Sequence, residues 1–511
     1  MLRTLAAALS SAACGSPHRA GTVPRIGAAI LALLFAATSF ANPPLEAQQA
    51  LRNAGLPDDA LAVVVLDAAT GRTLLDWQGS LPMNPASLAK LVTTQAALER
   101  LGPAWTWSTP VWLQGSIEGG VLDGHLHIKG SGDPTLVHER RWLLRRRVMQ
   151  LGVREIRGDI VLDNSAFAVP EAPPGDFDGE PLRAYNVRPV ALLLNYRAVV
   201  YTFTPDAGAG VARIGVEPAL IRTEVDRTVP LASGPCNDWR GALDLRFGTG
   251  AAAGAASTAD PPRVRFAGRY PLACGELAWA WADAQPATYD QRLLEGLWRE
   301  MGGTLGGRVR EGPAPAATRP TFEHRSPPLA EVVRDINKFS NNVMAEQLAL
   351  TLAREAAPSV PATPDAARAW LSRWLGERLG TRLAAGAVLS NGSGLSRDSR
   401  LSARQLARLL VLAAASPTMP ELMASLPISG TDGTARRFRS AVGRAHLKTG
   451  GLRDVFGIAG YVMATDGRRL VLVAIVNHAQ ANAAGPALDA LVQWAHASSS
   501  ASSSASRTPT P

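Results

Sequence analysis

The chain has 511 residues, which is too long for one compact core and favours two to four domains. Its 46% hydrophobic and 19% charged content is that of an ordinary globular protein. The net charge of +9 fits a solvated basic surface, an anionic polymer or a membrane surface. No arginine–aromatic run or zinc-finger spacing indicates nucleic acid as a partner.

Lysine is rare among the 52 basic residues. There are 48 arginines, and the four lysines are Lys90, Lys129, Lys338 and Lys448. An arginine keeps its charge at any working pH, whereas the amine of a lysine can lose its proton. A lysine in this chain therefore marks a position where an amine that can lose its proton could be needed.

Residues 1–41 are predicted to be an export signal. Arg19 and Arg25 precede the apolar run IGAAILALLFAATSFA, which ends with small residues at Ser39 and Ala41, as a cleavage site requires. The run is about 16 residues long, which is short for a membrane span. We therefore expect a periplasmic protein with no integral membrane span after removal of the signal.

The segment that follows the signal predicts two strands and a helix. ALAVVVLDAATGRTLLDWQGS reads as two strands joined by a tight turn. NPASLAKLVTTQAALERLG then predicts a helix, with Asn84 as its cap and Gly102 at its end. Ser87 would lie in the first turn of this helix, with Lys90 one turn further along the same face.

The middle of the chain, up to about residue 322, is predicted to be mostly β structure, because short alternating stretches are broken by Gly, Pro and Asp. Cys236 and Cys274 predict one disulfide that closes a loop of about 39 residues, with two buried free thiols as the alternative. No CxxC or HExxH motif occurs, and His125 and His127 read as one face of a strand. We expect no metal site and no cofactor.

Helices return after about residue 327 and are followed by strands. INKFSNNVMAEQL predicts a helix in which Ser340–Asn341–Asn342 form a polar cluster, or alternatively a cap or surface patch. HLKTGGL places Lys448–Thr449–Gly450 on a strand-like segment, where glycine lets another backbone or a ligand approach closely. The alternative is an edge-strand lysine near a turn. Residues 497–511 are a low-complexity tail that we expect to be disordered.

These three elements together indicate one kind of chemistry. A serine hydroxyl is a poor nucleophile until a base takes its proton, and Lys90 could do this for Ser87 only as a neutral amine. Burial and a nearby cation both lower the pKa of a lysine. Ser-x-x-Lys alone is weak evidence, since a solvent-facing lysine explains it equally well. Here, however, Ser-x-x-Lys, Ser-x-Asn and Lys-Thr-Gly follow the order found in penicillin-recognising acyl-serine enzymes.

On these motifs the chain resembles the class C, type-4 low-molecular-mass penicillin-binding proteins. These are bacterial D-alanyl-D-alanine carboxypeptidases and endopeptidases. Further stretches that match the pattern of the family are GSGDPTL, GDIVLDNSAF, YNVRPVALLLNY, NGSGLSRDSRLS and LPISGTDGTARR. The long separation between Lys90 and Ser340 fits the two extra domains, one nested in the other, that this family inserts there.

The resemblance implies an α/β (α+β) fold, in which a transpeptidase-like domain has an antiparallel sheet flanked by helices. The expected peptidase domain comprises 42–106 and 323–496. The outer inserted domain is expected at 107–135 and 226–322, and the nested domain at 136–225. Both inserted domains are expected to be rich in β structure.

The resemblance also implies catalytic roles. Ser87 attacks the carbonyl of the D-Ala-D-Ala bond, Lys90 is the general base for acylation, and Ser340 relays the proton to the departing amine. Water then hydrolyses the acyl-enzyme. The expected partners are peptidoglycan stem peptides and cross-links, and β-lactams would acylate Ser87 as inhibitors.

The other motif residues are implied to bind substrate. Asn342 bonds the substrate amide, Thr449 offers a hydroxyl to the terminal carboxylate, and Lys448 attracts that carboxylate and helps to lower the pKa of Lys90. Gly450 completes the Lys-Thr-Gly motif. The oxyanion hole would combine the backbone N–H of Gly451 with that of the nucleophile, and such donors are worth about 3–4 kcal/mol each in related chemistry.

The chain departs from the family pattern at two positions. Gly451 stands where Ser or Thr is common in the family, so this chain lacks a hydroxyl there. Asn341 stands where Asp is common, and its side chain is not expected to face the substrate. In the family, an acidic residue from the inserted region can recognise the free amine of diaminopimelate. Asp176, Asp178 and Glu180 in GDFDGEP are candidates, with a merely solvated loop cluster as the alternative.

Two other functions compete with a peptidase. A serine β-lactamase would need a way to activate the deacylating water, and no sequence feature provides one. A non-catalytic peptidoglycan-binding protein predicts decay of the motif residues, yet all three motifs are intact.

Overall fold

The computed structural model describes residues 42–249 and 262–499. The expected export signal, residues 250–261 and the part of the expected tail from Ser500 onward lie outside the described residues. Within these limits, no helix is both long and apolar enough to cross a membrane.

A five-stranded antiparallel sheet joins the two ends of the chain. Its strand order is β18-β19-β20-β1-β2, and the strands are β1 (Leu61–Asp67), β2 (Thr73–Trp77), β18 (Ala445–Leu452), β19 (Val455–Met463) and β20 (Arg469–Asn477). Alternate side chains of β1 enter different cores, with Val64 in one and Val63 in the other. A strand buried on both faces reads as a continuous apolar run, which is what LAVVVL shows.

Helices cover both faces of this sheet. Two terminal helices, α1 (Leu45–Asn53) and α11 (Gly485–Ala497), supply one of the two cores. The other core is supplied by α2 (Lys90–Leu101), α5 (Leu329–Phe339), α6 (Asn342–Ala356), α7 (Pro364–Leu379), α9 (Ala403–Ala414) and α10 (Met419–Ser425). A short helix, α8 (Thr381–Ala384), follows α7.

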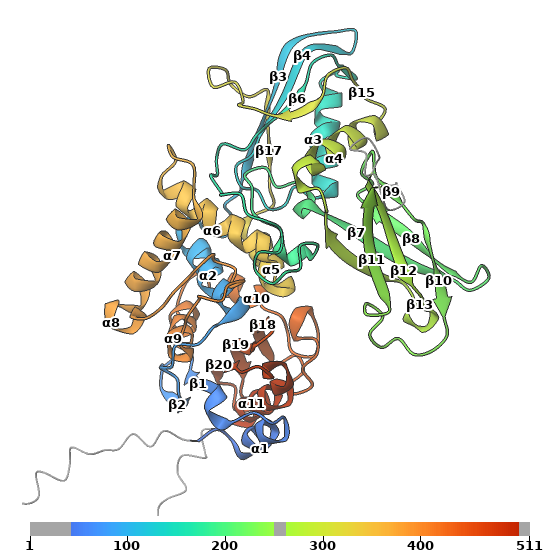
Figure 1. Ribbon diagram of the computed structural model, residues 1–511. Helices are drawn as coiled ribbons and strands as arrows, with labels where there is room; N and C mark the ends of the chain where they lie inside the picture. Colours follow the sequence, from blue (N-terminus) through green and yellow to red (C-terminus); the bar gives the residue numbers. More distant parts are fainter. Residues whose placement is uncertain (1–41, 250–261, 500–511) are drawn as a thin grey trace, which may run out of the picture. The chain divides into compact units, whose positions relative to one another are not determined.

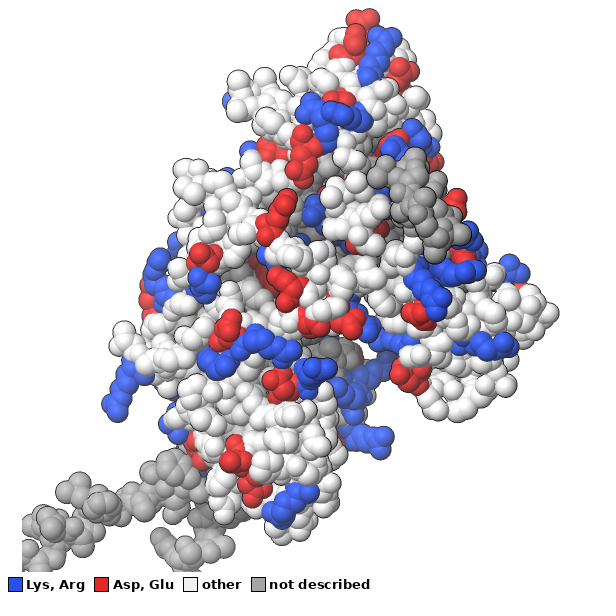
Figure 2. Space-filling view, in the orientation of Figure 1, with Lys and Arg blue, Asp and Glu red and all other residues white. Residues whose placement is uncertain are grey.

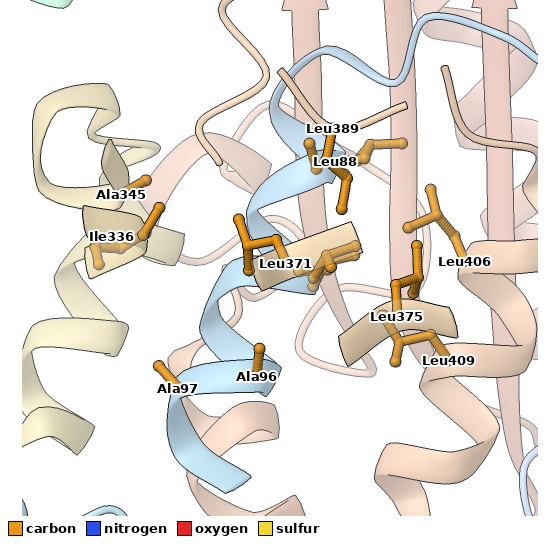
Figure 3. Close-up of a cluster of buried hydrophobic side chains, with 14 of the residues drawn as sticks. Leu88, Ala96, Ala97, Ile336, Ala345, Leu371, Leu375, Leu389, Leu406 and Leu409 are labelled. Carbon is orange, nitrogen blue, oxygen red and sulfur yellow. The ribbon is translucent and has the colours of Figure 1, made fainter. Parts of the chain in front are cut away.

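Helix α2 lies in the middle of the second core. All residues from Lys90 to Leu98 are buried. Figure 3 shows Ala96 and Ala97 on this helix, with Leu371 and Leu375 of α7 and Ile336 of α5 close by. Burying one leucine side chain contributes about 1.5–3 kcal/mol. The packing therefore fixes the helix that begins at Lys90.

The stretch of the chain from Ser108 to Arg325 forms three sheets among its described residues (Figure 1). The first contains β3 (Ser108–Glu118), β4 (Val121–Lys129), β5 (Glu155–Ile156), β6 (Ile160–Asp163), β15 (Thr304–Leu305), β16 (Val309–Glu311) and β17 (Phe322–Arg325). The second contains β7 (Ala198–Asp206), β8 (Val211–Glu217), β10 (Thr228–Ala232), β13 (Tyr270–Pro271) and β14 (Leu277–Ala282). The third contains β9 (Glu224–Val225), β11 (Leu243–Thr249) and β12 (Pro262–Gly268).

Some strand pairs join residues on either side of the expected boundaries of the nested domain, 136–225. Strands β5 and β6 pair with β4, so 155–163 joins the sheet that begins at Ser108. Strands β10 and β14 pair with β8 and β7, so 228–232 and 277–282 join the sheet that begins at Ala198. The signals for individual strands in the sequence do not say which distant strand each one pairs with, and the division into domains stays a prediction.

Two helices interrupt this β-rich region, α3 (His138–Gln150) and α4 (Pro286–Glu300). Sequence analysis missed α3 because its buried face carries Arg141 and Arg145, while Trp142 and Leu143 are exposed. That arrangement breaks the apolar periodicity by which an amphipathic helix is recognised.

The structure pairs Cys236 with Cys274 in a disulfide, with their Cα atoms 4.8 Å apart. The bond closes a loop that carries β11 and β12. In the chain-entropy account, a loop of about 39 residues gives a stabilisation of about 4 kcal/mol. The bridge thus supports the inserted region rather than the motif residues.

Surface charges of both signs are mixed. On the face drawn in Figure 2, Lys and Arg side chains are interspersed with Asp and Glu. Charged side chains of the described residues also form ion pairs, such as Arg397 with Asp454 at 2.7 Å and Arg188 with Asp176 at 3.3 Å. This pattern is typical of a solvated surface.

Candidate active site

Ser87 lies in a single 3₁₀ turn, Ala86–Ala89, directly before α2. Asn84 Oδ1 accepts a hydrogen bond of 2.9 Å from the Ala86 N–H, but Asn84 is not the expected helix cap, because α2 begins only at Lys90 and neither α2 nor the 3₁₀ turn has a side-chain cap. Ala86 has a φ of 45°, an uncommon backbone conformation for a non-glycine residue. The helix ends as expected at Gly102, with a φ of 86°. Ser87 is thus held on a tight turn at the start of a buried helix.

The Lys90 amine makes three hydrogen bonds that join distant segments. The distances from Nζ are 2.8 Å to Ser87 Oγ, 2.7 Å to Asn342 Oδ1 and 2.7 Å to the Ser393 carbonyl. A neutral amine has two N–H donors and one lone pair. With the two donors directed at Asn342 and Ser393, the lone pair is available to the Ser87 hydroxyl, which then donates to it.

Burial favours this neutral form. Lys90 is 0% exposed, and desolvation lowers the pKa of its amine from 10.5 to about 7, although the carboxylate of Glu346 acts in the opposite direction. Burial, one of the two causes expected from the sequence, is therefore the main cause of the low pKa of Lys90. A substantial fraction of the amine is neutral at neutral pH.

The second motif lies where α5 ends and α6 begins. Ser340 adopts a left-handed conformation with a φ of 57°, and the Asn341 side chain caps α6 by accepting a hydrogen bond of 3.1 Å from the Met344 N–H. Asn342, the first residue of α6, contacts Lys90 through Oδ1 and donates from Nδ2 to the Tyr185 carbonyl at 3.1 Å. The capping role explains why Asn can replace Asp at position 341.

The third motif lies on β18 at the edge of the central sheet. Lys448 Nζ donates to Ser340 Oγ at 2.9 Å and to the Thr449 carbonyl at 2.6 Å. Burial, together with repulsion from Lys90, lowers the pKa of Lys448 well below that of an ordinary lysine. Thr449 Oγ1 donates to Thr434 Oγ1 at 2.7 Å. The second and third motifs therefore meet at the Ser340 hydroxyl.

The two glycines after Thr449 have different surroundings. A Cβ atom on Gly450 would lie 2.8 Å from the Pro85 carbonyl oxygen and 3.1 Å from Leu88 Cγ. A Cβ atom on Gly451 would meet only the Val455 carbonyl oxygen, at 4.0 Å. Glycine at position 450 thus allows β18 to approach the Ser87 turn, whereas position 451 has room for a side chain.

A cavity of about 760 Å³ brings these motifs together. Its lining includes Ser87, Ser340, Asn342 and Gly451 from the motifs. Further lining residues come from the inserted region and from neighbouring loops, namely Phe177, Asp178, Glu180, Tyr185, Gly394, Leu395, Arg397, Leu452, Arg453 and Asn482. Asp176 borders a different cavity and pairs with Arg188.

Several residues that contact the site were not singled out by sequence analysis. Ser393 and Thr434 lie in NGSGLSRDSRLS and LPISGTDGTARR, two stretches that carried the resemblance but had no assigned role. Tyr185 lies in a third such stretch, YNVRPVALLLNY. Two of these three contacts are made by backbone carbonyls, which no side-chain motif can reveal.

Comparisons with known proteins identify the family. Residues 46–498 match the D-Ala-D-Ala carboxypeptidase 3 (S13) family. The chain belongs to this family. The D-alanyl-D-alanine carboxypeptidase of Actinomadura sp. (strain R39) is 31% identical over 500 residues, which cover 93% of this chain and 88% of that protein. D-alanyl-D-alanine carboxypeptidase DacB of Haemophilus influenzae is 23% identical, covering 88% of this chain and 92% of that protein.

Solved structures agree on the fold. Penicillin-binding protein 4 (dacB) from Haemophilus influenzae matches with a TM-score of 0.67 and 23% identity, over 85% of this chain and 94% of that chain. The predicted fold class and family are confirmed, and the protein is a serine hydrolase of the D-alanyl-D-alanine carboxypeptidase class.

The close approach at Gly450 can be tested by mutation. Gly450→Ala would force β18 and the Ser87 turn apart, so we expect labelling by a fluorescent penicillin to slow by about tenfold to a hundredfold. Gly376→Ala on α7 is the control, because a Cβ there meets no atom within 4 Å. A Gly450→Ala protein labelled at the wild-type rate would show that the close approach of β18 to the Ser87 turn is not needed for acylation.

Proposed function

We propose that Ser87 is the acylated nucleophile of a D-Ala-D-Ala carboxypeptidase that also cleaves peptidoglycan cross-links as a DD-endopeptidase. The observation that carries this proposal is the pair of contacts Lys90–Ser87 and Lys448–Ser340 around one cavity. A nucleophile in contact with a buried, neutral amine is the arrangement that serine acylation needs.

In the acylation step, the Ser87 Oγ–H proton passes to the neutral Lys90 amine as Oγ bonds to the carbonyl carbon of the penultimate D-Ala. The negative charge on the carbonyl oxygen would be stabilised by the N–H groups of Ser87 and Gly451. The C–N bond then breaks as Ser340 gives its hydroxyl proton to the departing amine and takes up in its place the proton held by Lys90. Water hydrolyses the resulting ester and regenerates Ser87.

Recognition of the substrate terminus would fall to the third motif. Lys448 Nζ contacts Ser340 Oγ, and Thr449 follows Lys448 on β18, so a D-Ala carboxylate bound by these two residues would place the scissile bond beside the nucleophile. Asn342 would bond the substrate amide while it continues to hold Lys90. A β-lactam carries an equivalent carboxylate and would acylate the same serine.

Among the acidic candidates for binding the diaminopimelate amine, the geometry favours Asp178. Asp178 and Glu180 line the cavity with Ser87, whereas Asp176 does not. Asp178 accepts hydrogen bonds of 2.8 Å from the Tyr185 hydroxyl and from Asn186 Nδ2. Burial, helped by this contact, raises the pKa of Tyr185 to about 12, so the phenol remains a donor that orients the carboxylate.

We place this activity in the periplasm, where peptidoglycan is accessible. The predicted signal at 1–41 and the disulfide Cys236–Cys274 both support export into an oxidising compartment.

The nucleophile and base roles predict a specific pattern of loss. Ser87→Ala and Lys90→Arg should both abolish release of D-Ala from a D-Ala-D-Ala peptide, because arginine cannot lose its proton. The wild-type acylation rate should rise with pH through a midpoint near 7, as Lys90 becomes neutral. Lys129→Arg, at a lysine paired with Asp163, is the control and should be fully active.

Full peptide cleavage by Ser87→Ala would overturn the assignment. Nitrocefin distinguishes the β-lactamase alternative, since a peptidase should form a lasting adduct on Ser87 whereas a β-lactamase should turn the substrate over.

Substrate preference tests the role of Asp178. Asp178→Asn should lower kcat/KM about two- to fivefold for a stem peptide with a free side-chain amine, as expected for an exposed charge pair. The same peptide with that amine acetylated should be unaffected. Asp176→Asn is the matched control, and equal losses on both peptides for Asp178→Asn would contradict amine recognition.

A further inference from the structure

The turn Asn391–Gly394 lies directly against the nucleophile turn. Asn391 Oδ1 accepts hydrogen bonds from the N–H groups of Ser393 and Gly394 at 3.1 and 3.0 Å. Gly394 has a φ of 79°, and a Cβ there would lie 1.9 Å from the Ala86 carbonyl oxygen. The turn therefore touches the residue that precedes Ser87, and its position affects the geometry of the site.

Glu346 holds this turn from the opposite side. Its Oε1 accepts a hydrogen bond of 2.8 Å from Ser393 Oγ and one of 3.1 Å from Asn391 Nδ2. Ser393 is 0% exposed, and its buried hydroxyl has two acceptors in reach, of which Glu346 Oε1 at 2.8 Å is closer than Asn391 Oδ1 at 3.1 Å. Glu346 is one helical turn beyond Asn342 on α6, so the two side chains leave the same face of the helix.

Helix α6 therefore reaches Lys90 by two routes. The direct route is Asn342 Oδ1, and the indirect route runs from the Glu346 carboxylate through the Ser393 hydroxyl to the backbone carbonyl of the same serine. These two acceptors engage two of the donors of the Lys90 amine. Because these two acceptors orient the amine, the third bonding direction of the Lys90 nitrogen points toward Ser87 Oγ.

We propose that Glu346 is a positioning residue for the general base: its carboxylate fixes the Asn391–Gly394 turn so that the Ser393 carbonyl orients Lys90, and its negative charge acts on the Lys90 amine. This inference rests on the proposed function, in which Lys90 takes the proton of Ser87. Neither the Ser-x-x-Lys nor the Ser-x-Asn motif includes Glu346.

The electrostatics agree with this geometry. Burial alone would lower the pKa of Lys90 further, and the Glu346 carboxylate raises it toward 7. Burial raises the pKa of Glu346 to about 7, while the Ser393 hydroxyl, Lys90 and Arg188 act to lower it and Asp176 acts to raise it. Two further charged residues, Arg397 and Asp398, border the cavity that Glu346 lines.

The test is the pH profile of acylation by a fluorescent penicillin, with thermal unfolding measured in parallel. Glu346→Gln keeps an oxygen acceptor but removes the charge, so the midpoint of the acidic limb should move about one unit below the wild-type value. Glu346→Ala also releases the turn, so the plateau rate should fall by about tenfold or more. Glu355→Gln, an exposed residue on the same helix, is the matched control and should follow the wild-type profile.

Ser393→Ala provides a second variant if neutralising Glu346 prevents folding. It removes the hydroxyl contact but keeps the carboxylate, so the plateau should fall while the midpoint stays closer to that of the wild type. Profiles for folded Glu346→Gln and Ser393→Ala that coincide with that of Glu355→Gln would overturn the positioning role. A wild-type protein that is not acylated on Ser87 would instead remove the proposed function, and this inference with it.

Discussion

The site depends on one buried amine. Lys90 Nζ is within 2.8 Å of three oxygens, and these belong to the Ser87 turn, to helix α6 and to the turn at Ser393. Segments separated by 252 and 303 residues along the chain therefore meet at a single nitrogen atom. A charged amine at this depth would be strongly disfavoured without a carboxylate in contact, so the fold that buries Lys90 also favours the form that can accept a proton.

Two of the four lysines contact carboxylates, and the other two contact neutral oxygen atoms. Lys129 and Lys338 pair with carboxylates, those of Asp163 at 3.6 Å and Asp432 at 2.5 Å. Lys90 and Lys448 instead contact hydroxyl, amide and backbone oxygens, which are neutral. Neutral acceptors satisfy the donors of an amine without holding its charge. This distinction gives a physical reason for lysine, rather than the prevalent arginine, at positions 90 and 448.

The sequence predicted the parts of the site that are carried by side chains at short spacing. Ser87 with Lys90, Ser340 with Asn342, and Lys448 with Thr449 could be found because the residues of each motif lie within three positions of one another along the chain. The Ser393 carbonyl could not be found, since a backbone acceptor carries no residue signature. Glu346 was visible only as one acid on a largely buried helix. Its relevance depends on the turn at Asn391, which tertiary packing brings alongside.

For the fold as well, the sequence predicted local elements better than contacts between distant segments. Strands and most helices of the peptidase part follow from apolar periodicity and from end signals such as Gly102, which ends α2. Pairing between distant strands, such as β6 with β4, is decided by tertiary structure, and the buried arginines of α3 concealed a helix.

The central claim is that the Lys90 amine is substantially neutral at neutral pH. With only four lysines in the chain, NMR of protein labelled with ¹³C at the lysine ε carbon can follow each amine separately, and Lys90→Arg identifies the signal of Lys90. The account predicts that this signal titrates with a midpoint near 7. A midpoint near the ordinary lysine value of 10.5 would contradict it.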